Sequence, residues 1–417
     1  MKFTGQILKS PRLRFNASLT YSTSHKPLDL RRFGPYDSTL FPLDKIRCKI
    51  IYLKNYEDVK DLIIEGLTRG IGIFDGYQKW FRVNITFDAK EISSESSDEL
   101  TRAAREVSTG NAEFVFVILS GRNPENYRIC KTILLGNGIP NQIITSISKL
   151  RDPEQRPWII SNIALSTYAK VGGTPWIVEG GVTRKELVIG VSRAQDVTRR
   201  YIIGFVTLYT QNGDFLLLHS QAPVIRWEEY VDGLRNLIVD AFRDYEKIRG
   251  IPNAIILHFH KKPGKPELNA IEDALKEVGQ DIPYALVHLN EYSNYRLFDS
   301  SHSSYVPQTG LAVRLSGRQA ILLLDGRADG PRRRIGVPRV LEVTLDKRSS
   351  IGVEEFPILL QQVYNFSYVN WRGFNAKSIP MTINYSYLIS RLVAEIGVNN
   401  WNSIISSGKL RDKAWFL

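Results

Sequence analysis

Hydrophobic and polar positions in the first half of the chain form blocks whose period alternates between that of a strand and that of a helix. Three runs have the apolar or alternating pattern of strands: CKIIYLK (48–54), FRVNITF (81–87) and FVFVILS (114–120). Three segments have the spacing of helices: 56–67, 96–107 and 125–136. Because a continuously apolar strand fits a sheet that is covered on both faces, this order predicts a small, doubly wound parallel sheet.

The pattern changes after Lys170, where long strand candidates follow one another without helices between them. These runs are LVIGVS (187–192), YIIGFVTLY (201–209) and FLLLHS (215–220), and they predict an antiparallel meander. Later elements are an amphipathic helix (226–250), a strand (254–258), a helix (269–279), a strand (284–289), a ribbon (311–316 and 319–325) and a helix (383–396). A three-strand meander followed by strands that helices separate is the order of an RNase H-like domain.

The amino-terminal residues have neither pattern. Residues 1–45 are polar, basic and irregular, and four prolines interrupt them: Pro11, Pro27, Pro35 and Pro42. We expect them to form a strap that lies over a domain. The chain of 417 residues is long enough for two or three domains. The predicted α/β organisation is therefore a strap (1–45), a Rossmann-like domain (46–170) and an RNase H-like domain (171–417).

The composition indicates that the protein binds an anionic partner. The chain has 55 Lys and Arg against 43 Asp and Glu, a formal charge of +12. Such an excess is typical of proteins that bind nucleic acid or a membrane surface, although a scattered surface surplus gives the same number. No run of apolar residues is long enough for a signal peptide or a membrane span, so a cytoplasmic protein without membrane insertion is expected. The two cysteines, Cys48 and Cys130, are too far apart in sequence to suggest a metal knuckle.

One set of side chains has the chemistry of a nucleotide terminus. Tyr127 and Lys131 are four residues apart on a predicted helix, Gln142 begins the next element, and Lys170 precedes a double glycine. An aromatic ring stacks on a base, while lysines and an amide bind phosphate oxygens. The alternative is that Tyr127 and Lys131 are a solvated helix face.

A second basic region lies in the ribbon and the loop after it. Seven arginines occur with only Asp325 and Asp329 between them: Arg314, Arg318, Arg327, Arg332, Arg333, Arg334 and Arg339. Three lysines after the strand at 254–258 add further positive charge: Lys261, Lys262 and Lys265. They could follow a phosphate backbone, or they could be an exposed basic loop.

The residues expected at a nuclease site are absent. An RNase H-like nuclease holds two Mg²⁺ ions with a carboxylate cluster whose first acid lies in the first strand, where this chain has Ser192. A second acid would lie near His260, and Asp196 is beyond the strand in a predicted turn. His258 and His260 share a strand face but have no third metal ligand nearby in the sequence. The chain also has no GxSxG motif, and Gly172 and Gly173 lack the Lys-Ser/Thr of a phosphate-binding loop.

KVGGTPW (170–176) resembles the segment that joins the MID and PIWI domains of Argonaute proteins. Four further segments resemble the same family, in the same order: RRFGPYD (31–37), YALVHLNE (284–291), NWRGFNAKSIPMTINY (370–385) and AWFL (414–417). The chain is most similar to short prokaryotic Argonautes of the archaeal Piwi-like type, which have only MID and PIWI domains. The resemblance implies a MID domain at 46–170 and a PIWI domain at 171–417.

The resemblance also implies roles for individual residues. Tyr127 would stack on the flipped first base of a guide, and Lys131, Gln142 and Lys170 would hold its 5′-phosphate. The carboxylate of Leu417 would complete the pocket by binding Mg²⁺ or Mn²⁺ between guide phosphates. This chain has Ser166 where the family can place an amide ligand. Arg372 matches a contact to the guide backbone.

The family's slicing members carry an Asp-Glu-Asp-Asp/His tetrad. Three of its positions match Ser192, His260 and Asn384, and the glutamate is not assigned, so the resemblance implies a PIWI domain that does not cut. It further implies a short guide, expected to be RNA, and a complementary target, expected to be DNA. A separate partner with an APAZ-like region would carry or recruit a toxic effector in prokaryotic antiviral or anti-plasmid defence. Two alternatives remain: an active guide-dependent nuclease with an atypical metal site, and a nonspecific basic binder.

Overall fold

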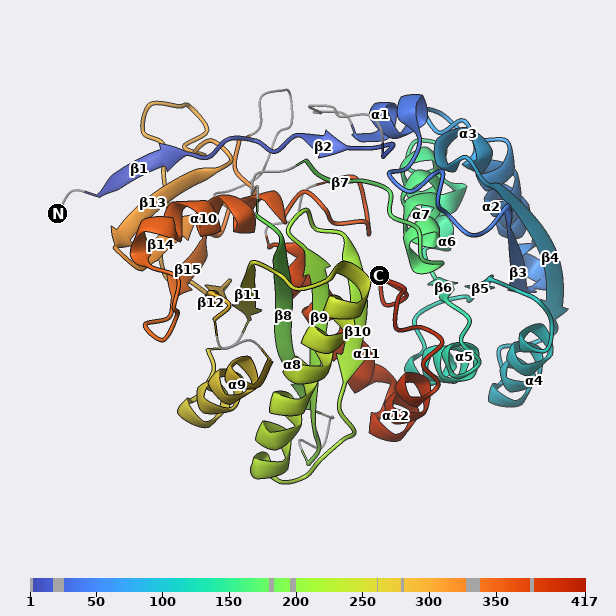
Figure 1. Cartoon of the computed structure of the whole chain (residues 1–417). Coiled ribbons are helices and arrows are strands. Elements are labelled where there is room, and N and C mark those ends of the chain that lie inside the picture. Colours follow the sequence, from blue (N-terminus) through green and yellow to red (C-terminus); the bar gives the residue numbers. More distant parts are fainter. Residues whose placement is uncertain are drawn as a thin grey trace.

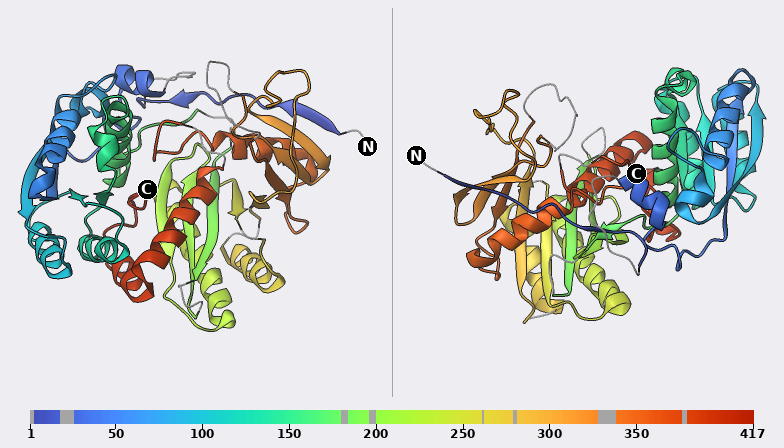
Figure 2. Two further views of the ribbon diagram at one scale, coloured as in Figure 1. Left: turned by 180° about the vertical axis from the view of Figure 1, so that it is seen from behind. Right: turned by 90° about the horizontal axis from the view of Figure 1, so that it is seen from above.

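The chain folds into two lobes, each built on its own β-sheet (Figure 1). The computed structural model describes residues 3–17, 26–179, 184–195, 200–260, 262–278, 281–327, 338–375 and 379–417. We call the part around the four-stranded sheet the small lobe and the part around the nine-stranded sheet the large lobe. The carboxyl terminus lies between them (Figures 1 and 2).

The small lobe contains a parallel sheet with the strand order β4-β3-β5-β6. Its strands are β3 (Lys45–Leu53), β4 (Asn84–Ile92), β5 (Phe114–Ile118) and β6 (Asn141–Ile144). Its helices are α2 (Glu57–Thr68), α3 (Tyr77–Phe81), α4 (Ser97–Ser108), α5 (Pro124–Gly136), α6 (Ile147–Arg151) and α7 (Arg156–Lys170). Alternate residues of β5 enter two different apolar clusters, one on each face of the sheet. The predicted doubly wound parallel sheet is confirmed.

One predicted strand of this lobe starts later than the sequence suggested. Residues 81–87 were expected to be extended, but Phe81 ends α3 and Arg82 has a left-handed φ of 60°. The ring of Phe81 stacks on Tyr168 of α7 with centroids 4.9 Å apart. Tertiary packing of this aromatic side chain therefore overrides the local alternation, and β4 begins at Asn84.

The large lobe contains a mixed sheet with the strand order β1-β13-β14-β15-β12-β11-β8-β9-β10. Its strands are β1 (Thr4–Ile7), β8 (Glu186–Gln195), β9 (Ile202–Thr210), β10 (Phe215–Ser220), β11 (Ala254–Phe259), β12 (Tyr284–Asn290), β13 (Leu311–Ser316), β14 (Gln319–Leu322) and β15 (Leu341–Leu345). Strands β8, β9 and β10 are antiparallel neighbours, and β11 is parallel to both β8 and β12. The predicted meander and RNase H-like order are confirmed; β15 was not predicted.

Helices cover both faces of the large sheet. Helices α8 (Trp227–Arg249) and α9 (Lys265–Val278) pack on the face that includes Leu187 and Ile189, whereas α10 (Phe356–Asn365) and α11 (Met381–Ile396) pack on the face that includes Val188. Gly190 of β8 lets α11 approach closely, because a Cβ atom there would lie 2.8 Å from the Thr382 carbonyl oxygen. Helix α12 (Val398–Ser406) follows α11 and lies beside α5 of the small lobe (Figure 1).

The amino-terminal segment extends across both lobes. Strand β1 adds to the edge of the large sheet by pairing with β13, and β2 (Leu13–Arg14) pairs with β7 (Ile177–Val178). The segment then reaches α1 (Lys26–Phe33) at the small lobe (Figure 2). Beyond α1, Asp37 accepts hydrogen bonds from the Tyr168 hydroxyl at 2.7 Å and the Thr174 backbone N–H at 2.8 Å. The segment is therefore tied to the connector that follows α7.

Candidate nucleic-acid interface

Helix α5 presents two of the predicted phosphate-binding residues on one face. The Asn123 side chain accepts hydrogen bonds from the backbone N–H groups of Glu125 and Asn126 and so caps the start of the helix, four residues before Tyr127. One turn separates Tyr127 from Lys131, and the Lys131 Nζ lies 5.6 Å from the centre of the Tyr127 ring. Tyr127 is half-buried and Lys131 is buried, so this face is not a solvated helix surface.

Strand β6 and the end of α7 bring the other two predicted residues to the same place. The ammonium groups of Lys131 and Lys170 each donate to the backbone carbonyl of Asn141 at 3.3 Å. Lys170 also donates to the Gln142 side-chain oxygen at 2.5 Å. Lys131 and Lys170, which are 39 positions apart in the sequence, thus converge on one carbonyl at the start of β6. The sequence had grouped these residues by their chemistry, and the resemblance had given each of them its role.

The two buried lysines give this site its electrostatic character. Desolvation lowers the pKa of Lys131 to about 8, although the charge of Glu395 opposes the shift. Desolvation also lowers the pKa of Lys170 well below its usual value, and the charges of Lys131 and Arg372 add to the effect. Among the described residues, neither lysine has a carboxylate within 4.0 Å. Two buried ammonium groups without an anion are unfavourable, and a bound anion would stabilise the charged form of both.

Arg372 lies close enough to both lysines to affect their pKa values, and its side chain is exposed. The preceding residue fixes its backbone, because the Trp371 indole is buried and donates to the Trp176 carbonyl at 3.1 Å. The structure thus adds an exposed guanidinium beside the buried pair. This position agrees with the predicted contact to a nucleic-acid backbone, and the contact itself stays a prediction.

The carboxyl-terminal segment packs against the small lobe. A Cβ atom on Gly138, just after α5, would meet the Lys409 side chain at 2.6 Å, and one on Gly172, just after α7, would meet Lys413 at 3.5 Å. Leu417, the last residue of this segment, is buried. The segment therefore passes the ends of the two helices that carry Lys131 and Lys170.

The donor set for the predicted metal ion is small. Ser166 is buried and its hydroxyl donates to the Ile163 carbonyl of its own helix at 3.1 Å, so it does not replace an amide ligand aimed at the pocket. The Leu417 carboxylate remains, and Mg²⁺ is commonly bound by one carboxylate together with phosphate oxygens of a ligand. The residues present fit a cation that a guide brings with it better than one that the protein holds alone.

Two of the three residues that the resemblance matches to the family's tetrad, Ser192 and His260, follow neighbouring positions of the large sheet. Val191 of β8 pairs with Phe259 of β11, so Ser192 and His260 are the next positions in that register. Asn384 is in the first turn of α11, which packs on the same face, and its amide donates to the Asn370 side chain at 3.4 Å. His260 Nε2 instead lies 3.0 Å from Glu291.

His258 and His260 do not share a ligand. His258 is fully buried, its Nδ1 lies 3.0 Å from the Thr382 hydroxyl, and burial lowers its pKa to about 3. In the part of the chain that the structure describes, no group of three or more His, Cys, Asp or Glu side chains is placed to hold a metal ion.

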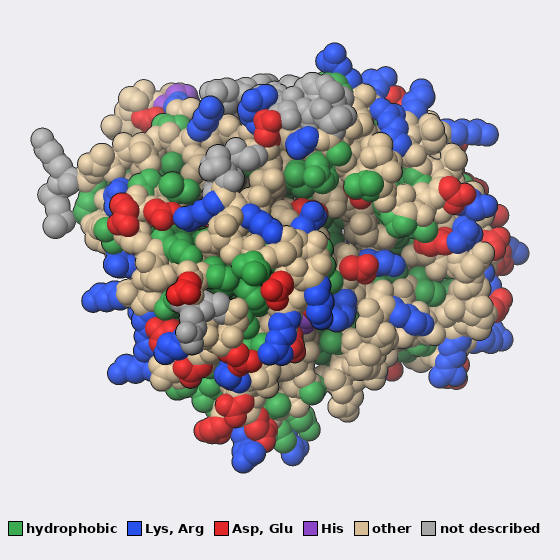
Figure 3. Space-filling view, in the orientation of Figure 1, with side chains coloured by type: hydrophobic (Ala, Val, Ile, Leu, Met, Phe, Trp, Pro, Cys, Tyr) green, Lys and Arg blue, Asp and Glu red, His purple; other side chains and the backbone are tan. Residues whose placement is uncertain are grey.

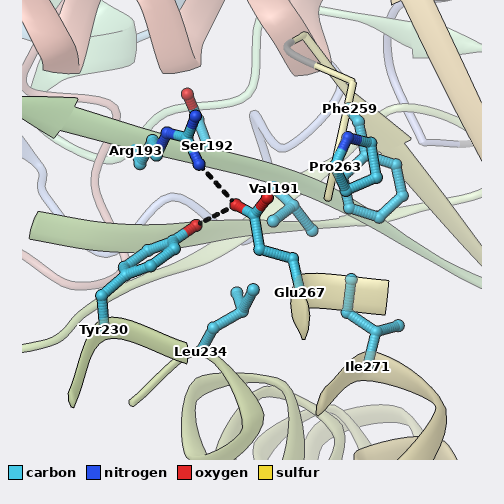
Figure 4. Close-up of a pocket in the computed structure, with 9 residues that line it drawn as sticks. All are labelled: Val191, Ser192, Arg193, Tyr230, Leu234, Phe259, Pro263, Glu267 and Ile271. Atoms are coloured by element: carbon cyan, nitrogen blue, oxygen red, sulfur yellow. Dashed lines mark hydrogen bonds and ion pairs between the residues drawn. The ribbon is translucent and has the colours of Figure 1, made fainter. Parts of the chain in front are cut away.

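A pocket lies at the end of β8, under α8 and α9, and Ser192 is one of its lining residues together with Val191 and Arg193 (Figure 4). Its buried carboxylate, Glu267, accepts from Arg193 at 2.7 Å and from the Tyr230 hydroxyl at 2.9 Å (Figure 4). Arg193 also lies over the Trp227 ring, 4.8 Å from its centre. Because each charged group has its partner, this pocket is explained by packing between the sheet and its helices. A larger pocket between β12, β15 and the residues after β11 includes His288 and Glu342.

The arginine cluster is less continuous than the sequence suggested. Three of the described arginines are engaged within the protein: Arg314 donates to the Gly317 carbonyl at 3.1 Å, Arg318 donates to the Asp346 carbonyl at 3.1 Å, and Arg327 pairs with Asp299 at 3.3 Å. The fourth, Arg339, is exposed. Several residues of the predicted basic regions lie outside the described residues: Lys261, Asp329, Arg332, Arg333 and Arg334. Asp196, predicted to lie in a turn after the first strand of this lobe, also lies outside them. On the face shown in Figure 3, Lys and Arg are spread over both lobes with acids among them.

Sequence reasoning missed two contributors to the site. The Asn141 carbonyl that orients both lysines is a backbone group with no signature of its own. Glu395 on α11 affects Tyr127 and Lys131, yet in the sequence it is only the second member of an Arg391–Glu395 pair with helical spacing. That pair is visible in the sequence, whereas its approach to α5 is not.

Comparison with known proteins agrees with the fold and with the order of the motifs. A family model described as the Piwi domain matches residues 114–326, just over half of the chain. The "Protein argonaute" of Cereibacter sphaeroides is 24% identical over 442 residues, covering 93% of this chain and 56% of the relative. The "Piwi protein" of Archaeoglobus fulgidus is 22% identical over 413 residues, covering 93% of this chain and 92% of the relative.

Solved structures show the same fold at lower identity. Drosophila Piwi aligns with a TM-score of 0.75 and 15% identity, covering 99% of this chain and 56% of that protein. Clostridium butyricum Argonaute bound to a guide DNA and a 19-mer target DNA aligns with a TM-score of 0.75 and 16% identity, covering 95% and 53%. This chain thus spans about half the length of several relatives and nearly all of the archaeal one. The resemblance inferred from the motifs is confirmed, and the chain belongs to the Piwi-domain family of Argonaute and Piwi proteins.

Proposed function

We propose that this protein binds the 5′-phosphate of a short guide strand in the pocket formed by α5, β6 and the end of α7, and uses the guide to bind a complementary strand. One observation carries the proposal: the Lys131 and Lys170 ammonium groups are buried, converge on the Asn141 carbonyl, and lack a carboxylate partner among the described residues. A protein keeps such a pair when an anion from outside compensates it.

The surrounding groups favour a nucleotide over a simple anion. Tyr127 lies beside the lysines with its ring half-buried, which suits stacking on a terminal base. Gln142 adds an amide next to Lys170, and Arg372 adds an exposed guanidinium of the kind that binds the next phosphate. A terminal phosphate has up to two negative charges and is matched by two ammonium groups.

We further propose that the protein does not cut its target. The three tetrad positions carry Ser192, His260 and Asn384, none of which supplies the negative charge that paired magnesium ions need. The protein would then act by signalling: an APAZ-like partner with a toxic effector, in cytoplasmic antiviral or anti-plasmid defence, would respond to target binding. RNA as guide, DNA as target, and Mg²⁺ or Mn²⁺ at the guide phosphate belong to the same proposal. The Clostridium butyricum Argonaute structure contains a DNA guide, so the binding test compares RNA guides with DNA guides directly.

Binding of labelled single strands tests the pocket. Guides of one sequence with 5′-phosphate or 5′-hydroxyl ends, as RNA and as DNA, are titrated into the wild-type protein and into Lys131→Ala/Lys170→Ala. The expected result is a preference for the 5′-phosphate that the double variant loses, while 5′-hydroxyl binding changes little. Equal loss for both ends would instead indicate a nonspecific basic binder.

Incubation of the guide-loaded protein with a matched target and Mg²⁺ or Mn²⁺ tests the absence of cleavage. No product is expected. Guide-dependent cleavage that His260→Ala abolishes would favour the alternative of an active nuclease with an atypical metal site, in which the His260–Glu291 pair would be the first place to look.

A further inference from the structure

The loop that follows β12, residues 291–305, gathers exposed aromatic side chains. Four of them lie on it, with between 47% and 67% of their surface exposed: Tyr292, Tyr295, Phe298 and Tyr305. In the rest of the described chain, the large aromatic residues that are exposed are Phe3, Trp158 and Tyr387. Exposed aromatic side chains that lie close together in this way usually mark a binding surface.

Hydrogen bonds hold the backbone of this loop. The Asp299 carboxylate accepts from the Ser301 backbone N–H at 3.0 Å and pairs with Arg327 at 3.3 Å. The Asp299 N–H donates to the Tyr305 carbonyl at 3.0 Å, and the Tyr305 N–H donates to the His302 carbonyl at 2.9 Å. The loop therefore presents its aromatic rings from a defined backbone.

One of these aromatic residues has a strained backbone. Tyr305 has a left-handed φ of 54°, which is rare for a bulky residue and which glycine or asparagine adopts at lower cost. The turn does not require a tyrosine, and the ring is exposed, so packing does not require one either. Strained residues of this kind cluster at functional sites, which indicates that the side chain itself is used.

The loop begins beside the degenerate tetrad positions. Glu291, its first residue, lies 3.0 Å from His260 Nε2, and the rings of His260 and Tyr292 have centroids 6.4 Å apart. Ser192 is the neighbouring position on β8. Because the proposed function brings a target strand to the tetrad positions, the exposed rings are next to the path of that strand.

The charges of the loop favour a nucleic acid over an apolar protein partner. Both of its acids, Glu291 and Asp299, have basic partners. Arg296 is exposed, and its hydrogen bonds within the described chain go to the backbone carbonyls of Ser293 and Tyr295. Its guanidinium charge therefore stays available for a phosphate beside the rings, and surfaces that bind single strands combine these two kinds of group.

We propose that residues 291–305 form a stacking platform for unpaired bases of a target strand where it extends beyond its duplex with the guide. This inference rests on the proposed function, because the guide brings the strand to this surface. Every base has a flat π-face, so the stacking platform would tolerate any sequence. It would add affinity for targets that continue past the paired region.

Targets with single-stranded extensions test the proposal. The guide-loaded protein is titrated with a matched target that carries, at its 3′ end or its 5′ end, either thymidines or the same number of abasic nucleotides. The wild-type protein should bind the thymidine extension at one end at least about fivefold more tightly than the abasic one, as for one stacked base. The ratio should persist as the salt concentration rises, because both strands carry the same phosphates.

Variants of the loop identify the rings as the cause. Tyr292→Ala/Tyr295→Ala/Phe298→Ala should abolish the difference, whereas Tyr292→Phe/Tyr295→Phe, which keeps the rings, should retain it. Tyr305→Asn should reduce the difference without lowering the unfolding temperature, since asparagine tolerates the left-handed conformation. The matched control replaces three exposed isoleucines around α8 with alanine and should change nothing: Ile225, Ile248 and Ile251.

Equal binding of thymidine and abasic extensions at both ends by the wild-type protein would overturn the proposal and would assign the rings to a protein partner instead. A difference that survives in the folded triple-alanine variant of the loop would overturn it too. Failure of the proposed function is distinguishable, because the wild-type protein would then show no preference for a 5′-phosphate. The stacking platform alone fails when that preference is present and the bases of the extension make no difference.

Discussion

Replacing Lys170 by methionine should weaken guide binding and at the same time stabilise the guide-free protein. Lys170 is 1% exposed, desolvation lowers its pKa, and no carboxylate compensates it among the described residues. Methionine has a similar length and no charge, so it can fill the same space. The two oxygens that lose Lys170 as a donor keep other hydrogen-bond partners. Lys131 still donates to the Asn141 carbonyl, and the half-buried Gln142 side chain can bond to water.

The two effects can be given rough sizes. Replacing a buried charge by an apolar side chain of similar volume often stabilises a protein by about 1–4 kcal/mol. Losing one charge-assisted hydrogen bond to the phosphate should weaken binding by about 1.5–3 kcal/mol, roughly 10-fold to 150-fold in Kd. The measurements are thermal or denaturant unfolding without guide, and titration with 5′-phosphate and 5′-hydroxyl guides. Lys276→Met, an exposed lysine on α9, is the control and should change neither.

A combined outcome would refute this reasoning. If Lys170→Met lowered the unfolding temperature and weakened both guides equally, Lys170 would be a structural residue whose ammonium is needed by the fold. If it raised stability but left 5′-phosphate binding intact, the uncompensated charge of Lys170 would bind a ligand other than the guide phosphate.

Three further predictions follow from the same contacts. Burial lowers the folded-state pKa of Lys131 to about 8, so the cost of burying its charge is fully present below that pH and is relieved as the pH rises from about 8 towards the unfolded value of 10.5. Over this window the stability of the guide-free protein should rise and the affinity for a 5′-phosphate should fall. Unfolding and titration at each pH measure the two, and an affinity that does not change with pH would argue against Lys131 as a phosphate ligand. Tyr127→Ala should weaken guide binding by about 1–3 kcal/mol, whereas Tyr127→Phe should retain most of it, since stacking needs the ring; equal losses in titration would assign the role to the hydroxyl. Gly173→Ala should lower the unfolding temperature, because the added Cβ would lie 2.3 Å from a ring carbon of Tyr168; an unchanged temperature would mean that the connector adjusts freely.

Much of the fold follows from local pattern. The continuously apolar run at β5 and the helical spacing around it predicted the parallel sheet of the small lobe, and the meander β8-β9-β10 followed from three strands with no helix between them. Local pattern was insufficient where a contact between distant segments decided the outcome. Phe81 belongs to a helix because it stacks on Tyr168, and the polar strand β1 exists because β13 offers it an edge.

The candidate site divides in the same way. The sequence by itself determined the identities and order of Tyr127, Lys131, Gln142 and Lys170. It also determined that Ser192, His260 and Asn384 stand at the positions predicted to match the family's tetrad. Only the tertiary structure decided that two lysines from different helices meet at one carbonyl and that they are buried. The physical reason is that a charge pattern along the chain says which groups are present, whereas desolvation and the distance between charges depend on how elements that are far apart in sequence pack together.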